Sequence, residues 1–136
     1  MQQLLLPVFA ILTITLIGAC NLEGDCYYQQ EIPVTSFAVP DSVPEDSLFT
    51  INYDAYLSNS CGSYYTTNLS ELEDTIYFQV WADFNGCDCA STKKSEAKSI
   101  ELSLLKSKDY YFKAWFYNDS TANYVIITKK VKVYGN

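Results

Sequence analysis

The sequence has 136 residues, enough for one domain, and carries 16 acidic against 9 basic residues, for a formal net charge of −7. All nine basic residues are Lys, so the chain lacks the guanidinium groups used for bidentate phosphate contacts, and the negative charge further disfavours nucleic acid as a partner. The sequence has no His, which excludes Ser-His-Asp and Cys-His catalysis, and we expect no enzyme activity, cofactor or metal ion.

The N-terminal residues are typical of an export signal. An apolar run from Leu4 to Ile17 is about 14 residues long, whereas a helix needs about 20 residues to cross a bilayer. The residues before this run include no Lys or Arg, so the terminal amine is the only positive charge there. We predict that residues 1–19 are a signal peptide and that the rest of the chain is exported.

The end of the apolar run, Leu16-Ile17-Gly18-Ala19-Cys20, resembles the lipobox of bacterial lipoproteins. The resemblance implies a diacylglycerol thioether on Cys20, cleavage before this residue and acylation of the new amine. Several acyl chains anchor a protein to a membrane permanently. Asn21 stands where an Asp would retain a lipoprotein in the inner membrane, so the resemblance implies anchoring in the outer membrane. The alternative is an ordinary secretory signal followed by an unrelated Cys.

Two patterns follow the lipobox. Residues 20–31 are polar and acidic without periodicity, which predicts a lipidated tether. From Ile32 onward apolar and polar residues alternate, as in strands with one buried face, and no stretch has the pattern of an amphipathic helix. The predicted strands are Val34 to Val39, Leu48 to Leu57, a short one at Tyr64 to Asn68, Thr75 to Phe84, Ser99 to Leu104, Tyr110 to Tyr117 and Tyr124 to Tyr134.

This series of strands predicts an all-β fold, an antiparallel two-sheet sandwich of about seven strands over residues 32–136. Tyr110 opens an alternating strand six residues after Leu104, which resembles the tyrosine corner of immunoglobulin-like and fibronectin type III-like domains. The resemblance implies an immunoglobulin-like sandwich in which the Tyr110 hydroxyl bonds to the backbone upstream. The usual Gly or Pro of the corner is replaced here by Lys106-Ser107-Lys108-Asp109.

Five cysteines in an exported chain leave one unpaired, and lipidation of Cys20 accounts for it. The other four, Cys26, Cys61, Cys87 and Cys89, are expected to form two disulfides in an oxidising compartment. A bond between Cys87 and Cys89 would close a tight ring across one residue, so each is expected to pair with Cys26 or Cys61. The alternative is a soft-metal thiolate site at Cys87-Asp88-Cys89.

Strand length restricts the pairing further. Cys61 follows the strand Leu48 to Leu57, and a strand of about 10 residues spans about 33 Å. Bridged Cα atoms lie within about 7 Å, so Cys87 and Cys89 reach Cys61 only if Tyr64 to Asn68 first returns along the sheet. We therefore predict that Tyr64 to Asn68 is a strand, that Cys61 bonds to Cys87 or Cys89, and that Cys26 takes the other.

Aromatic residues are frequent, with 12 Tyr in the chain. Exposed rings on a sheet can stack on sugars or form a protein-binding patch. The alternative is that they contact loops or cross-strand neighbours, because Tyr and Trp are good strand formers. The strand alternation places five of these rings on the face opposite the expected core, namely Tyr77, Trp81, Tyr111, Trp115 and Tyr117.

These observations favour a lipid-anchored, disulfide-stabilised and non-catalytic binding module of the cell envelope, with the five aromatic residues as the candidate ligand-binding site. The membrane, through Cys20, and a glycan or an envelope protein are the expected partners. A carbohydrate-binding accessory lipoprotein is one alternative. A structural or inhibitory protein that docks on another protein through an edge strand or loops is the other.

Overall fold

The structure of the protein, a computed structural model, describes residues 26–135. The predicted signal peptide and the predicted lipidation site Cys20 lie outside the described residues. Residues 26–135 form nine strands and no helix, so the all-β prediction is confirmed, and none of them belongs to a helix able to span a membrane. The strands are β1 (Tyr27–Ile32), β2 (Val34–Ala38), β3 (Ser42–Pro44), β4 (Phe49–Leu57), β5 (Gly62–Leu72), β6 (Thr75–Asn85), β7 (Lys94–Leu102), β8 (Asp109–Asn118) and β9 (Asn123–Tyr134).

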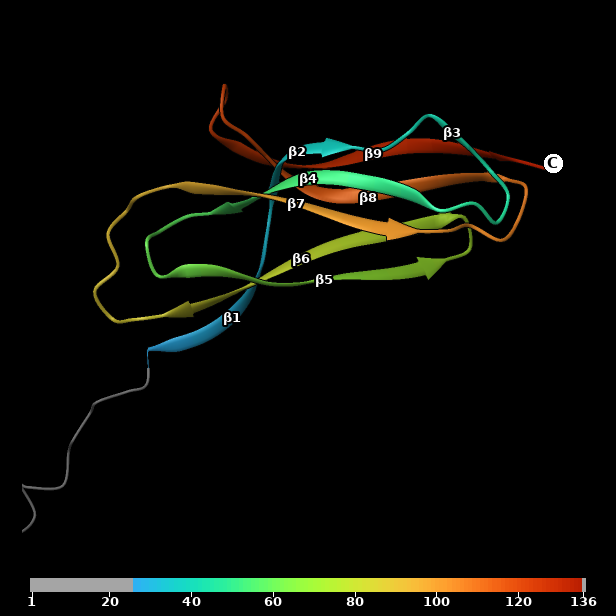
Figure 1. Ribbon diagram of the computed structural model, residues 1–136. Coiled ribbons are helices and arrows are strands. Elements are labelled where there is room, and N and C mark those ends of the chain that lie inside the picture. The colour runs from blue at the N-terminus through green and yellow to red at the C-terminus, as the bar shows by residue number, and fades with distance from the viewer. Residues whose placement is uncertain (1–25, 136) are drawn as a thin grey trace, which may run out of the picture.

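The nine strands form one curled, mixed sheet (Figure 1). Backbone pairing runs continuously through β5, β6, β8, β2, β4 and β7, while β1 also pairs with β6, β9 with β8 and β3 with β9. Three of the pairs are parallel, namely β6 with β8, β2 with β8 and β3 with β9. The pairing thus differs from the purely antiparallel two-sheet arrangement expected from the sequence. Alternation determines which face of a strand is buried, but not which strands become its neighbours.

The chain crosses from one side of the curled sheet to the other between β1 and β2. β1 pairs with β6 from Tyr27↔Asn85 to Ile32↔Val80, whereas β2 pairs with β4. Pro33 separates the two strands and has no N–H to donate to a ladder. In Figure 1 the connection rises from β1, across the other strands, to β2. The pairing of β1 with β6 therefore ends at Ile32↔Val80.

The core lies inside the curl and consists of the inward side chains of the alternating strands. In β6 these are Ile76, Phe78, Val80, Ala82 and Phe84, as the alternation predicts. The ring of Phe78 contacts Phe37 and Tyr53 edge-on, with centroids 4.8 and 4.9 Å apart. No charged side chain is buried within residues 26–135, so apolar burial provides the main stabilisation of the domain.

The strands differ from the sequence prediction mainly in β1, β3 and β7, and β5 extends beyond the predicted Tyr64 to Asn68 at both ends. Residues 27–31, assigned to the tether, belong to β1, whose polar side chains show no alternation because most of them are exposed. β3 is only three residues long and was not predicted. β7 begins at Lys94 rather than Ser99. Its first half carries the charged residues Lys94, Glu96 and Lys98 on one face, so it lacks the apolar alternation of a typical strand. One edge of β7 pairs with β4, and the other edge is unpaired in the described chain. Charged side chains commonly protect such edges from association.

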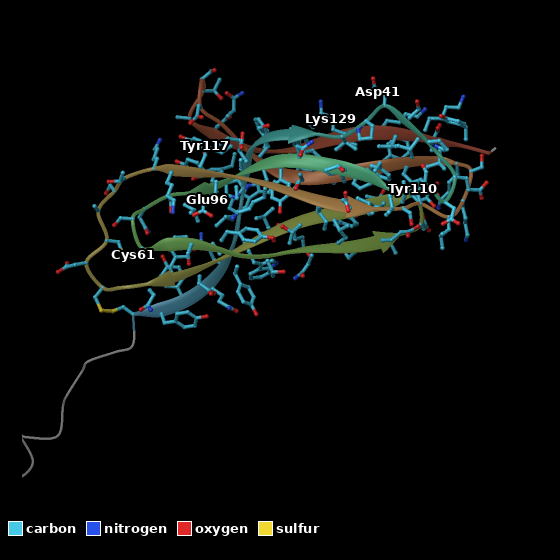
Figure 2. The ribbon with its side chains drawn as sticks, in the orientation of Figure 1. Asp41, Cys61, Glu96, Tyr110, Tyr117 and Lys129 are labelled. Carbon is cyan, nitrogen blue, oxygen red and sulfur yellow. A yellow bond between two sulfur atoms is a disulfide. The ribbon has the colours of Figure 1, made fainter. Side chains whose placement is uncertain are left out.

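Two disulfides close one end of the sheet, where Figure 2 shows Cys61. Cys26 is bonded to Cys87 and Cys61 to Cys89, with Cα atoms 5.0 and 5.4 Å apart. This is one of the two pairings that the sequence left open. β5 runs back along the sheet and contains the predicted return strand Tyr64 to Asn68. All four cysteines are therefore used in disulfides, which argues against the alternative thiolate site.

Tyr110 lies at the other end of the sheet (Figure 2). Its side chain is buried, and burial raises the pKa of its hydroxyl, whereas a hydrogen bond with the Lys106 backbone acts in the opposite direction. The Lys108 ammonium lies 4.5 Å from the centroid of the Tyr110 ring.

Candidate functional site

The five aromatic residues predicted for the outer face fall into three groups. Tyr77 and Tyr111 are exposed, at 38% and 37% of their surface. Trp81 and Trp115 are partly buried. Tyr117 is only 5% exposed, so the prediction that it lies on an open surface is wrong. The Tyr56 ring of β4 stacks on Tyr117, and the alternation of β8 alone does not predict this contact.

The edge of β6 that faces β8 changes partner along its length. From Thr75 to Phe78 this edge pairs with β8, and from Val80 onward it pairs with β1, while the opposite edge pairs with β5 throughout. Gln79 lies at the change. Because β1 ends at Ile32 and the chain then leaves for β2, β6 and β8 diverge at this point. We call this place the fork.

A cavity of about 310 Å³ opens on the outer face of the sheet at the fork. This volume lies at the lower end of the roughly 300 to 1,000 Å³ typical of small-molecule sites. Four strands contribute to its lining, which consists of Glu31 from β1, Tyr77, Phe78 and Gln79 from β6, Lys113, Ala114 and Trp115 from β8, and Ile126 from β9. We call this cavity the fork hollow. Of the five predicted aromatic residues, Tyr77 and Trp115 line it and the other three do not.

The lining of the fork hollow contains both apolar side chains and polar groups. Tyr77 and Ile126 are exposed, Ile126 at 64%, and supply apolar surface together with Trp115. The Gln79 amide nitrogen donates to the Glu31 carboxylate at 3.3 Å. The Lys113 ammonium lies 5.9 Å from the centroid of the Tyr77 ring, near the outer limit of a cation–π contact. The lining therefore carries one negative charge, one positive charge and one neutral amide.

A series of ring contacts holds Trp115 in place. Tyr56 of β4 stacks on Tyr117 with ring centroids 4.4 Å apart, Tyr117 contacts Tyr124 at 5.0 Å, and Tyr124 contacts Trp115 at 5.2 Å. The Lys93 ammonium donates to the Tyr117 hydroxyl at 3.0 Å, and this hydrogen bond raises the pKa of Lys93. Tyr117 is thus a supporting residue of the site rather than part of its surface. Rings fixed in this way lose little freedom when a ligand binds.

Trp81 has a packing role. It lies on the outer side of β6, opposite Glu31 of β1 and Thr66 of β5. Its indole N–H is buried and has no hydrogen-bond partner in the described part of the chain. Leaving a buried donor unpaired costs about 1 to 3 kcal/mol. Tyr111, further along β8, is exposed but lies outside the fork hollow.

Besides the core-facing Phe78 and Ala114, four residues of the lining are not among the predicted site residues, namely Glu31, Gln79, Lys113 and Ile126. Glu31 falls in the predicted tether, Gln79 and Lys113 fall on the outward faces of predicted strands, and Ile126 falls in the predicted strand Tyr124 to Tyr134. One signal was available, because Gln79 and Lys113 lie on the same strand faces as the predicted rings Tyr77 and Trp115. Glu31 of β1 and Ile126 of β9 come close to these residues because β6 changes its pairing partner. The local sequence pattern does not predict that change.

A second, larger cavity of about 470 Å³ lies between β2 and β9, where β2 leaves β8 after the pair Val34↔Phe116. Phe37 and Phe116, the rings in its lining, pack against the core, and Lys129 is the charged residue of the lining. It offers no exposed aromatic ring. We therefore regard the fork hollow as the candidate site despite its smaller volume. In residues 26–135 no group of three or more Cys, Asp or Glu side chains is arranged to hold a metal ion.

Comparisons with protein-family models, with curated proteins and with solved structures find no match to this chain. The interpretation of the fork hollow therefore rests on its own geometry and chemistry. Those features are an exposed ring, Tyr77, a partly buried ring, Trp115, that contacts Tyr124, and a small set of balanced polar groups at a break in the sheet.

Proposed function

We propose that this protein is a lipoprotein of the cell envelope, anchored in the outer membrane through Cys20, and that its domain is a non-catalytic binding module. The disulfides support the first part. They pair the four other cysteines with one another, which leaves Cys20 as the cysteine available for a lipid. Disulfides also suit the oxidising compartments outside the cytoplasm.

The anchor would hold the domain close to the membrane. Five residues lie between Cys20 and Cys26, and an extended chain covers at most about 3.6 Å per residue, or about 22 Å over these six steps. Cys26 is fixed to the domain by its disulfide to Cys87, and its carbonyl accepts a hydrogen bond from the Gly86 N–H at 2.9 Å. The disulfide end of the sheet therefore faces the membrane in this proposal, and ligands near the membrane surface come within reach.

The observation that carries the binding function is the fork hollow. Exposed apolar residues grouped around polar ones commonly mark interaction sites, whereas single exposed rings need no explanation. Tyr77, Trp115 and Ile126 come from three strands and meet at one cavity. The ring contacts that run from Trp115 through Tyr124 and Tyr117 to Tyr56 give this surface a fixed shape. Such preorganisation favours binding because less freedom is lost on association.

We also interpret the curled sheet as a variant of the immunoglobulin-like sandwich. Two observations support this. The contact of Tyr110 with the Lys106 backbone is of the tyrosine-corner type. The Tyr53 hydroxyl of β4 lies 2.6 Å from the Thr67 hydroxyl of β5, so these two strands approach each other across the curl. The parallel pairs are the departure from that architecture.

Docking on an envelope protein through β9 is a second candidate function. One edge of β9 pairs with β8, whereas the other pairs, within the described residues, only over 132–134 with β3. Tyr124, Val125 and Ile126 are exposed on the part without a second partner. Edges of this kind can accept a strand from another chain. Val125→Lys tests this candidate, because Val125 does not line the fork hollow.

A co-sedimentation assay tests the proposed function. Cys20→Ser in the full chain is expected to move the protein from the detergent phase to the aqueous phase. Co-sedimentation of this variant with isolated envelope fragments then measures binding by the domain without the anchor. Tyr77→Ala combined with Trp115→Ala is expected to abolish co-sedimentation. Tyr65→Ala is the matched control, because Tyr65 is 55% exposed and lies outside the fork hollow.

Three outcomes would contradict the proposal. Recovery of Cys20→Ser entirely in the detergent phase would refute the lipid anchor. Full co-sedimentation of the Tyr77 and Trp115 double variant would refute the fork hollow as the binding surface. Loss of co-sedimentation on Val125→Lys alone would replace the fork hollow by the edge of β9.

A further inference from the structure

The geometry points to a neutral sugar ring, a pyranose unit of a glycan, as the ligand of the fork hollow. This inference rests on the proposed function and names its ligand class. Three features of the hollow carry it, namely its charge balance, its set of donors and acceptors, and the kind of apolar surface it offers.

The charge balance favours a neutral ligand. Glu31 and Lys113 are partly buried and both line the hollow, so its lining carries no net charge. A phosphate or carboxylate ligand would be attracted by Lys113 but repelled by Glu31. A cation would meet the opposite conflict. A neutral molecule meets neither, and it benefits from the charge on both side chains through stronger hydrogen bonds.

The donor and acceptor set favours hydroxyl groups. The Glu31 carboxylate only accepts hydrogen bonds, the Lys113 ammonium only donates them, and the Gln79 amide does both. A hydroxyl donates one hydrogen bond and accepts others, so a ligand with several adjacent hydroxyls satisfies all three side chains at once. A purely apolar ligand would remove these groups from water without replacing their hydrogen bonds, which is unfavourable.

The apolar surface completes the argument. Each face of a pyranose ring presents C–H groups, and aromatic rings attract such groups because their faces are electron-rich. Tyr77 and Trp115 lie on neighbouring strands and line the same cavity, while Ile126 adds an aliphatic surface. The Lys113 ammonium, 5.9 Å from the Tyr77 ring centroid, makes only a weak contact there and is available to a ligand oxygen.

The size of the hollow separates a sugar from a protein partner. A stable protein interface buries about 800 Å² on each side, and a peptide strand is recognised mainly through backbone hydrogen bonds at a sheet edge. The fork hollow has a volume of about 310 Å³ and lies on the face of the sheet. It suits one or two sugar rings of a longer glycan.

The test uses the purified full protein and a panel of neutral hexasaccharides, namely cello-, malto-, xylo- and manno-hexaose, with hexagalacturonate as the acidic counterpart. Titration calorimetry is expected to detect binding of at least one neutral member and none of the acidic one. Trp115→Ala and Tyr77→Ala are each expected to weaken that binding about tenfold or more, equivalent to about 1.4 kcal/mol. Glu31→Gln keeps the hydrogen-bond partner of Gln79, so a loss of about threefold is expected there, and Tyr65→Ala should bind as the unchanged protein.

The same panel separates this inference from the proposed function. If neutral hexasaccharides also displace the protein from envelope fragments, the sugar is the envelope ligand. If the Tyr77 and Trp115 double variant loses co-sedimentation but no hexasaccharide binds or competes, the fork hollow remains the binding surface and the sugar inference is wrong. Stronger binding of hexagalacturonate than of the neutral sugars would also overturn it. Equal binding of sugar by the unchanged protein and by Trp115→Ala would place the sugar elsewhere on the molecule.

Discussion

The ring of Tyr117 lies almost parallel to that of Tyr56, with centroids 4.4 Å apart and an angle of 16° between the planes. The two residues come from β8 and β4, which are joined through β2. Figure 2 shows Tyr117 toward the same end of the sheet as Cys61. The stack buries a ring that the sequence pattern places at the surface, and through Tyr124 it supports Trp115 in the fork hollow.

Replacing Tyr117 is expected to affect stability through its ring rather than its hydroxyl. Tyr117→Ala should lower the free energy of unfolding by about 3 kcal/mol, as loss of a buried aromatic ring usually does. Tyr117→Phe keeps the stack and loses only the hydrogen bond from Lys93, so the expected loss is below about 1 kcal/mol. Urea denaturation measures both. Equal losses for the two variants would show that the stack contributes little.

The close approach of Gly62 to the Phe84 ring gives a second prediction. A Cβ atom at Gly62 would lie 2.8 Å from a ring atom of Phe84 and 3.1 Å from a methyl carbon of Leu57, and both side chains are buried. Gly62→Ala should therefore cost about 1 to 3 kcal/mol by overpacking. Gly135→Ala is the control, because its nearest atoms lie at 3.8 Å. A Gly62→Ala protein as stable as the control would contradict the packing described for this end of the core.

The disulfide pairing predicts which peptides remain linked. Cys87 and Cys89 are separated only by Asp88, so the protein must be cleaved at Asp88 without reduction. This digestion should yield one peptide pair containing Cys26 and Cys87 and another containing Cys61 and Cys89. The double change Cys61→Ser and Cys89→Ser should lower the free energy of unfolding by about 3 kcal/mol, because the bond closes a segment of 28 residues. Detection of a Cys26 to Cys61 peptide pair would reject the arrangement of β4, β5 and β6.

Glu96 gives a pH dependence of stability. Its carboxylate lies 2.6 Å from the Lys94 ammonium and 3.2 Å from that of Lys98, and the hydrogen bond from Lys94 is the main cause that lowers the pKa of Glu96. A pKa lowered in the folded state adds stability that is present above the unfolded value of about 4.3 and is lost as the pH falls through the folded value. Glu96→Gln should remove this contribution to stability, which is at most about 1 kcal/mol. The free energy of unfolding of the variant should therefore fall less between pH 6 and pH 2 than that of the unchanged protein. An identical fall in both proteins would show that the ion pairs of β7 do not contribute.

Much of the fold follows from the alternation of residue types. β4, β6, β8 and β9 are long strands with an apolar inward face, and the sequence predicts them closely. Strands without that contrast are harder to predict. Most residues of β1 are exposed and show no apolar alternation. β3 is only three residues long and pairs with β9. The first half of β7 carries charged residues at an edge of the sheet. Their conformation depends on the neighbouring strand rather than on their own residues.

The candidate site was only half predictable for a related reason. Tyr77 and Trp115 were found because alternation places them on an outward face. Tyr117 was misplaced because Tyr56 reaches it from another strand, and Glu31 was missed because β1 has no pattern of its own. The fork depends on the change of partner at Gln79. The two pairings that meet there join residues 48 apart in the sequence, at Ile32↔Val80, and 36 apart, at Thr75↔Tyr111.

The measurement that tests the account most directly is a two-dimensional proton–nitrogen NMR titration of the full protein with neutral oligosaccharides released from purified envelopes. The chain has two Trp, so it gives two indole N–H signals, which Trp81→Phe assigns. The account predicts that the indole signal of Trp115 and the amide signals of Tyr77, Gln79 and Lys113 shift together with one saturating curve, while the indole signal of Trp81 stays in place. Shifts confined to the edge of β9 or to the cavity between β2 and β9, or no shift at saturating sugar, would contradict the assignment of the fork hollow as the recognition site.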